Sequence, residues 1–165
     1  MTTFTRAQLY EILGTVPDPE VPAISVVDLG IVREALQRAD GTVEVTITPT
    51  YSGCPAMFEI EKDVRAALIG AGAAQVEVRT VLSPAWTTDW IPETAREKLR
   101  QYGIAPPGRA ESGGLVTLTR ARPPVACPRC GSRSTTLKSE FGSTACKAIH
   151  VCNACREPFD EFKAI

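Results

Sequence analysis

The chain has 165 residues, of which 44% are hydrophobic and 22% are charged, and its 18 basic and 19 acidic side chains leave a net charge of −1. This composition is typical of a globular domain and excludes a mostly disordered chain. The sequence has neither an apolar run of about 18 residues for a membrane helix nor an N-terminal secretory signal, so we expect a cytoplasmic protein that does not enter the membrane.

Helix and strand patterns alternate over the first hundred residues. Apolar spacing and turn residues predict, in chain order, a helix over residues 5–15, strands over 31–37 and 43–48 joined at Asp40-Gly41, a helix over 55–70, a strand over 76–82 and a helix over 91–102. Helices interleaved with strands around one sheet indicate an α/β fold. We therefore expect a small mixed-sheet domain with the element order αββαβα.

The near-neutral charge is the average of two unlike parts. Residues 1–104 carry nine basic and fourteen acidic side chains, whereas residues 105–165 carry nine and five. Proline and glycine clusters lie between the two parts and are typical of turns and connectors. We predict a first domain over residues 1–104, a linker over 105–126 and a cysteine-rich module over 127–165.

Two C-x-x-C pairs, separated by 21 residues, lie in that module. Each pair can form a tight turn that directs two sulfurs at one ion, and together the pairs predict a tetrahedral site, in a zinc ribbon, made by Cys127, Cys130, Cys152 and Cys155. A module this small and poor in large apolar side chains needs a metal to fold. Disulfides or spare thiols are the alternative, and they are less expected in a chain without a secretory signal. Zinc is the expected metal, although four thiolates also suit iron.

Cys54 lies apart from these pairs, in the sequence Ser52-Gly-Cys-Pro55 between a predicted strand and a predicted helix. With Pro55 at the first helical position, Cys54 would be the N-cap, where backbone N–H groups and the helix dipole favour a thiolate. The carboxyl ends of strands are where α/β proteins place ligands. The alternative is a buried cysteine that acts as a small apolar residue.

Other candidate groups are few. Cys146 is a fifth thiol that a four-ligand site does not need. It could be a second metal ligand, a transfer site or a buried structural residue, and the sequence does not decide among these. His150 is the only histidine, which leaves little scope for a catalytic pair with Cys54. Asp18 and Asp28 could act as acid or base groups, although loop carboxylates usually cap turns. These residues do not predict an enzyme.

Nucleic acid is not the expected partner of the ribbon. Its charge is only modestly basic, and its aromatic residues are too few for a stacking platform. A structural or protein-docking ribbon is therefore favoured.

Five motifs occur in an order that resembles a known family: Asp18-Pro-Glu-Val-Pro22, Val27-Asp-Leu-Gly30, Thr46-Ile-Thr-Pro-Thr50, Ser52-Gly-Cys-Pro55 and Ser83-Pro-Ala-Trp86. Together they resemble the small α/β domain of SufT-like iron–sulfur assembly factors over residues 5–104. The segment Ser139–Ala148, framed by the two cysteine pairs, makes the whole chain resemble the family of D subunits of bacterial phenylacetyl-CoA epoxidase systems.

The resemblance implies an accessory role in delivering or inserting iron or an iron–sulfur cluster during aerobic phenylacetate catabolism. Cys54 would bind the iron or cluster transiently, with Asp18, Asp28 and Thr46 on the matching motifs. The implied partners are the oxygenase and reductase subunits of the epoxidase, and a second copy of the chain. Two other hypotheses remain: a structural subunit that handles no metal, and a nucleic-acid-binding ribbon protein.

Overall fold

The computed structural model describes residues 2–108 and 123–165, and the chain divides into two compact units. Residues 1–86 and 90–92 form the first unit, and residues 87–89 and 93–165 form the second. Among the described residues, no helix has the length and apolar character that a membrane crossing requires.

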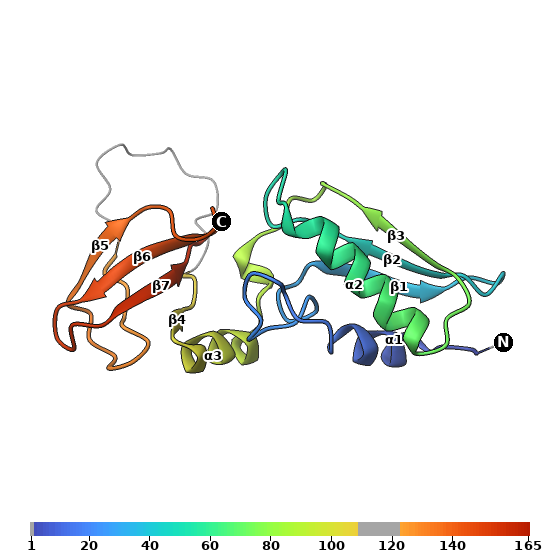
Figure 1. Cartoon of the computed structure of the whole chain (residues 1–165), viewed down its shortest axis with the longest axis horizontal. Coiled ribbons are helices and arrows are strands. Elements are labelled where there is room, and N and C mark those ends of the chain that lie inside the picture. Colours follow the sequence, from blue (N-terminus) through green and yellow to red (C-terminus); the bar gives the residue numbers. More distant parts are fainter. Residues whose placement is uncertain (1, 109–122) are drawn as a thin grey trace. The chain divides into compact units, whose positions relative to one another are not determined.

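The described residues of the first unit form two α-helices and three strands, which Figure 1 shows. In chain order these are α1 (Arg6–Leu13), β1 (Val32–Gln37), β2 (Val43–Ile47), α2 (Ala56–Gly70) and β3 (Val76–Thr80). The sheet has the order β1-β2-β3, with β2 antiparallel to β1 and parallel to β3. The predicted elements are therefore confirmed, and the mixed sheet is the one expected for this α/β fold.

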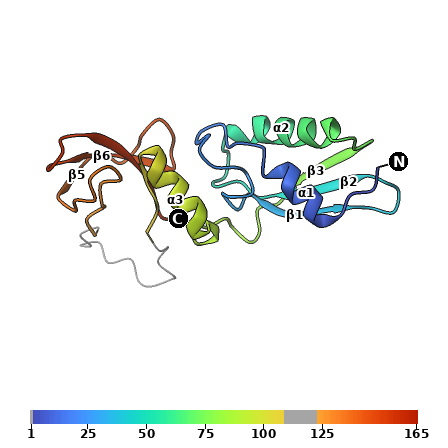
Figure 2. The same cartoon turned by 90° about the horizontal axis from the view of Figure 1, so that it is seen from below.

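The core of this unit lies on one face of the sheet. Alternate residues of β2 are completely buried, while Glu44 and Thr46 between them are half-buried, as period-two alternation requires. Helix α2 buries the residues that recur every four positions, and α1 packs against α2 and β1. Figure 2 shows α2 lying along the sheet. Fully buried side chains of this core include Leu9, Leu13, Ile47, Ile60, Val64 and Leu68.

Two tryptophans close the end of the core where β2 leaves the sheet. Trp86 is buried, and its indole N–H donates to the carbonyl oxygen of Leu29 at 2.9 Å. Trp90 packs against Gly30, which has a φ of +75°. If Gly30 carried a Cβ, that atom would lie only 3.0 Å from the Cβ of Trp90. Gly30 is thus required both by its backbone conformation and by the close approach of Trp90.

We expect Gly30→Ala to destabilise the first unit by about 1–3 kcal/mol, since it adds a steric conflict to the cost of a left-handed backbone. Gly53→Ala is the matched control, because Gly53 also has a positive φ but has no atom within 4 Å of an added Cβ. Urea unfolding followed by tryptophan fluorescence measures both variants. Equal destabilisation by the two substitutions would contradict a role for the contact with Trp90.

Outside residues 109–122, the second unit contains an α-helix and a four-stranded sheet. Its elements are α3 (Glu93–Tyr102), β4 (Ile104–Ala105), β5 (Thr135–Ser139), β6 (Lys147–Cys152) and β7 (Pro158–Phe162), preceded by the short 3-10 helix η1 (Thr88–Trp90), whose last residue belongs to the first unit. The sheet order is β4-β7-β6-β5, with β4 parallel to β7 and the other pairs antiparallel. Antiparallel strands around the cysteine pairs give the expected ribbon.

The division between the units differs from the boundary expected at residues 104/105. Helix α3 leads directly into β4, which pairs with β7, and Arg96 of α3 donates to the carbonyl oxygen of Thr88 at 2.9 Å. The predicted linker is also partly structured: Ala105 and Val125 pack in the ribbon core, while residues 109–122 lie outside the described part. The amphipathic pattern of α3 identified a helix but not the sheet beside which it packs.

Candidate functional site

Four sulfurs from the two C-x-x-C pairs come together in the second unit. The Sγ atoms of Cys127, Cys130, Cys152 and Cys155 all lie within 4.8 Å of one another. The Cys127–Cys155 sulfur pair is separated by 3.8 Å and the Cys130–Cys152 pair by 3.5 Å. These distances are far longer than a disulfide bond of about 2 Å, so the alternative of two disulfides does not describe this structure.

The two turns that carry these cysteines are built alike. In the first, Gly131 has a φ of +76° and its N–H donates to the Cys127 carbonyl oxygen; in the second, Arg156 has a φ of +67° and donates to the Cys152 carbonyl oxygen. The left-handed residue lets the chain turn sharply after each pair, so both sulfurs of the pair face the same point. Arg156 is the one described non-glycine residue with a positive φ.

This donor set fits a tetrahedral metal ion. A tetrahedron with metal–sulfur bonds of about 2.3 Å has sulfur–sulfur edges of about 3.8 Å, close to the two distances above. Cys127 and Cys152 are buried with Phe159 and Ala105 in a small apolar cluster, so the site is continuous with the core of the ribbon. The four cysteines would hold zinc, which would crosslink the two turns.

The thiols also differ in acidity. The N–H of Cys155, then that of Ala154 and the thiol of Cys130, stabilise the Cys152 thiolate and lower the pKa of Cys152 to about 6. For Cys155, the N–H of Glu157 favours the thiolate, but burial and the neighbouring sulfurs outweigh it and raise the pKa to about 12. Backbone N–H donors thus favour the thiolate form of Cys152, which is the form that binds a metal.

Cys54 lies at the end of the first unit where β2 leads into α2. The predicted N-cap position is wrong by one residue: Pro55 is the N-cap, and α2 begins at Ala56. Pro55 has helical angles, but the bond from the Met57 N–H to the Cys54 carbonyl oxygen, 3.2 Å, spans only three residues, so the first turn is tighter than an α-helical one and the α-helix proper starts at Ala56. Cys54 is 9% exposed and sits directly before the positive end of the helix dipole.

Asp18 and Asp28 organise one loop before β1. The buried Asp18 carboxylate accepts from the N–H groups of Glu20 and Val21, at 2.9 and 2.8 Å. Asp28 and Ser25 cap each other, since each side chain accepts from the other residue's N–H. Both carboxylates therefore cap turns of this loop, and their part in iron handling stays a prediction. Because the Thr48 N–H donates to Ile31, this loop borders the chain that leaves β2 toward Cys54.

Two threonines lie in or just after β2, on the chain that leads to Cys54. Thr46 is within β2, on the face opposite Val45 and Ile47, and it is paired with residues of β1 and β3 rather than placed at the end of the sheet. Thr48 was missed by sequence reasoning: it is 1% exposed, and its hydroxyl has no hydrogen-bond partner within the described residues. A buried, unpaired hydroxyl is costly, but strand alternation gives no signal for it.

Cys146 and His150 stay outside the four-sulfur cluster. Cys146 is buried, with its sulfur 3.1 Å from the Thr144 hydroxyl oxygen. The His150 Nε2 atom lies 2.8 Å from a carboxylate oxygen of Glu161, and its ring stacks on Phe159. His150 is thus packed within the ribbon sheet.

Two family models match this chain, one in each unit. The model described as "Iron-sulfur cluster assembly protein" matches residues 6–80, and the model described as "PaaD zinc beta ribbon domain" matches residues 111–163. The fold and the two candidate sites therefore define an iron–sulfur assembly domain joined to a zinc ribbon.

Relatives narrow this class further. The chain is 48% identical, over all of its length and 98% of the relative, to the D subunit of the "Putative 1,2-phenylacetyl-CoA epoxidase" of Escherichia coli. It is 36% identical, over 58% of its length and 90% of the relative, to the "Fe-S protein maturation auxiliary factor" of Porphyromonas gingivalis. A domain of unknown function from Bacillus anthracis superposes with a TM-score of 0.53 at 29% identity, covering 57% of this chain and 90% of that one. The chain belongs to the family of phenylacetyl-CoA epoxidase D subunits.

Proposed function

We propose that this chain is an accessory maturation factor that delivers or inserts iron, or an iron–sulfur cluster, into the oxygenase or reductase subunits of a phenylacetyl-CoA epoxidase during aerobic phenylacetate catabolism. The observation that supports the proposal is the position of Cys54, a buried thiol where β2 leads into α2, in the part of the chain that matches an iron–sulfur assembly model. The role fits both the named maturation factors and the named epoxidase subunit among its relatives.

The chemistry required of Cys54 is ligand exchange. Its thiolate would bind the iron or cluster as cargo, and one protein thiolate leaves the other coordination positions open to a client. As a client thiolate forms its bond to iron, the bond from iron to Cys54 breaks, with no change in oxidation state. Asp18 and Asp28 would organise the neighbouring loop, and either carboxylate could supply a harder ligand. The part that Thr46 takes stays a prediction from the resemblance.

The function proposed here is not catalytic. The sole histidine of the chain is packed against Glu161 and Phe159 in the second unit, and this supports a binding role over acid–base catalysis at Cys54. The ribbon would serve protein docking, with zinc as its structural metal.

Co-expression tests the function directly. We expect epoxidase oxygenase and reductase subunits produced with the chain to contain more iron and to be more active than the same subunits produced without it. Iron and acid-labile sulfide, measured per purified subunit, give the readout. Equal metal content in both preparations would overturn the proposal.

A second candidate function is a structural subunit of the epoxidase, because the Escherichia coli relative is named as a subunit. A structural subunit would co-purify with the epoxidase at a fixed ratio and leave its metal content unchanged. The same preparations, examined by size-exclusion chromatography, distinguish this outcome from maturation.

A further inference from the structure

Two of the three exposed large apolar side chains described in the first unit lie at one end of it. Phe58 on α2 is 74% exposed, and Leu82, just after β3, is 63% exposed. Single exposed apolar residues are common on protein surfaces. Two that lie at the same end of a unit, beside a candidate site, are more informative.

The hydrogen bonds of the unit place both residues at the Cys54 end. The Thr80 hydroxyl donates to the Glu61 carboxylate at 2.9 Å, which joins the end of β3 to the second turn of α2. Phe58 precedes Glu61 by three residues, so the two are neighbours on the helix surface. Leu82 lies two residues beyond Thr80, and the Val81 N–H donates to Ile47 at the end of β2.

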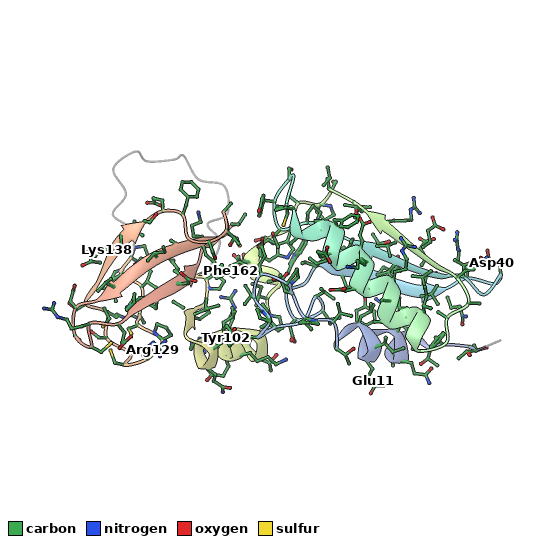
Figure 3. All side chains as sticks on the ribbon, viewed as in Figure 1. Glu11, Asp40, Tyr102, Arg129, Lys138 and Phe162 are labelled. Carbon is green, nitrogen blue, oxygen red and sulfur yellow. The ribbon has the colours of Figure 1, made fainter. Side chains whose placement is uncertain are left out.

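The direction of the elements then fixes where this surface lies. Because β2 and β3 are parallel, α2 between them runs back along the sheet, so its N-terminus meets the carboxyl end of β3. Figure 1 shows the chain leaving β3 at the end of the unit where α2 begins. Figure 3 labels Asp40 at the opposite end, in the β1–β2 turn. Phe58 and Leu82 therefore share their end of the unit with Cys54.

The charge around this surface selects the kind of partner. The first unit has six basic side chains against eleven acidic ones, a net charge of −5. Two of the acidic residues, Glu59 and Glu61, lie on α2 next to Phe58, with Lys62 paired to Glu59 at 3.1 Å. A partner that complements this charge presents basic side chains around an apolar centre.

We propose that Phe58 and Leu82 form a docking surface (the Phe58–Leu82 surface) for the client protein, which contacts it with an apolar patch bordered by lysine or arginine. The proposal rests on the proposed function, since docking here brings the client to Cys54. Two exposed apolar side chains would act as the centre of a larger, polar interface. Attraction between opposite charges would make the association faster at low ionic strength.

The test measures binding of the full chain to purified oxygenase and reductase subunits of phenylacetyl-CoA epoxidase by surface plasmon resonance. We expect Phe58→Ser with Leu82→Ser to weaken binding to one of them by about tenfold or more, the loss typical of central interface residues. Ile69→Ser is the matched control: Ile69 is 53% exposed on the same helix but at its far end, and its replacement should leave the Kd within about twofold.

Several results would overturn the docking proposal: an unchanged Kd in the double variant, equal losses in the double variant and the Ile69 control, or no binding of the wild-type chain. A double variant that loses self-association while still binding the clients would assign the surface to a second copy instead. A separate result tests the proposed function. If Cys54→Ala lowers client iron while the double variant binds normally, docking is wrong and maturation stands.

Discussion

Cys54→Ala is expected to leave both units folded and to lower the iron content of co-expressed epoxidase subunits to the level found without the chain. The side chain is small, and removing its buried sulfur costs on the order of 1 kcal/mol, too little to unfold a domain. What is lost is the soft ligand at the start of α2. Iron per client subunit, with circular dichroism of the purified variant, measures the two effects separately.

Two further variants sharpen this test. Cys54→Ser keeps the size of the side chain but replaces the sulfur with a poor ligand for iron, so it should behave like Cys54→Ala if the thiolate matters. Cys146→Ala removes a thiol that is buried in the ribbon, outside the four-sulfur cluster, and should leave client iron unchanged. Full iron loading with both Cys54 variants would show that Cys54 acts only as a packed residue.

Removing the ribbon metal is expected to unfold the second unit and spare the first. Structural zinc contributes on the order of 10 kcal/mol to folding, more than a small apolar cluster can replace. A strong chelator, or Cys127→Ser, should therefore abolish the dispersed NMR signals of β5–β7 while the signals of β1–β3 persist. Cys146→Ser is the control and should keep one zinc per chain.

Acid should have the same effect as the chelator, because protons compete with the metal for the thiolates. Without metal, the N–H groups of Cys155 and Ala154 already lower the pKa of Cys152 to about 6, and a bound metal favours the thiolate further, so protons should displace the metal only below this pH. Zinc release, followed with a colorimetric chelator, should accordingly increase below this pH. A ribbon that keeps its NMR signals without metal would contradict this account.

Sequence patterns predicted the secondary structure of the first unit because each element has a strong local signal. Period-two alternation in β2 and four-residue spacing in α2 both reflect burial of one face, and the structure shows that burial. The spacing of the two C-x-x-C pairs likewise predicted the sulfur cluster, because each turn is local.

Features that depend on distant residues were harder to predict. No local pattern indicates that β4, only two residues long, pairs with β7 more than fifty positions later, so the boundary between the units was placed too late. Thr48 is buried because the Asp28 loop reaches the end of β2, a long-range contact that strand alternation does not encode. The N-cap of α2 shifted by one residue, as helix ends often do.

The short strand β4 has a consequence for any isolated ribbon. By pairing with β7, it covers what would otherwise be an unprotected strand edge, and unprotected edges recruit strands from other chains. A fragment that starts at the first cysteine pair would carry every metal ligand and still lack this cover. Such a fragment would bind zinc yet be more prone to aggregation than one that starts at residue 93, which would keep β4 paired with the middle of β7.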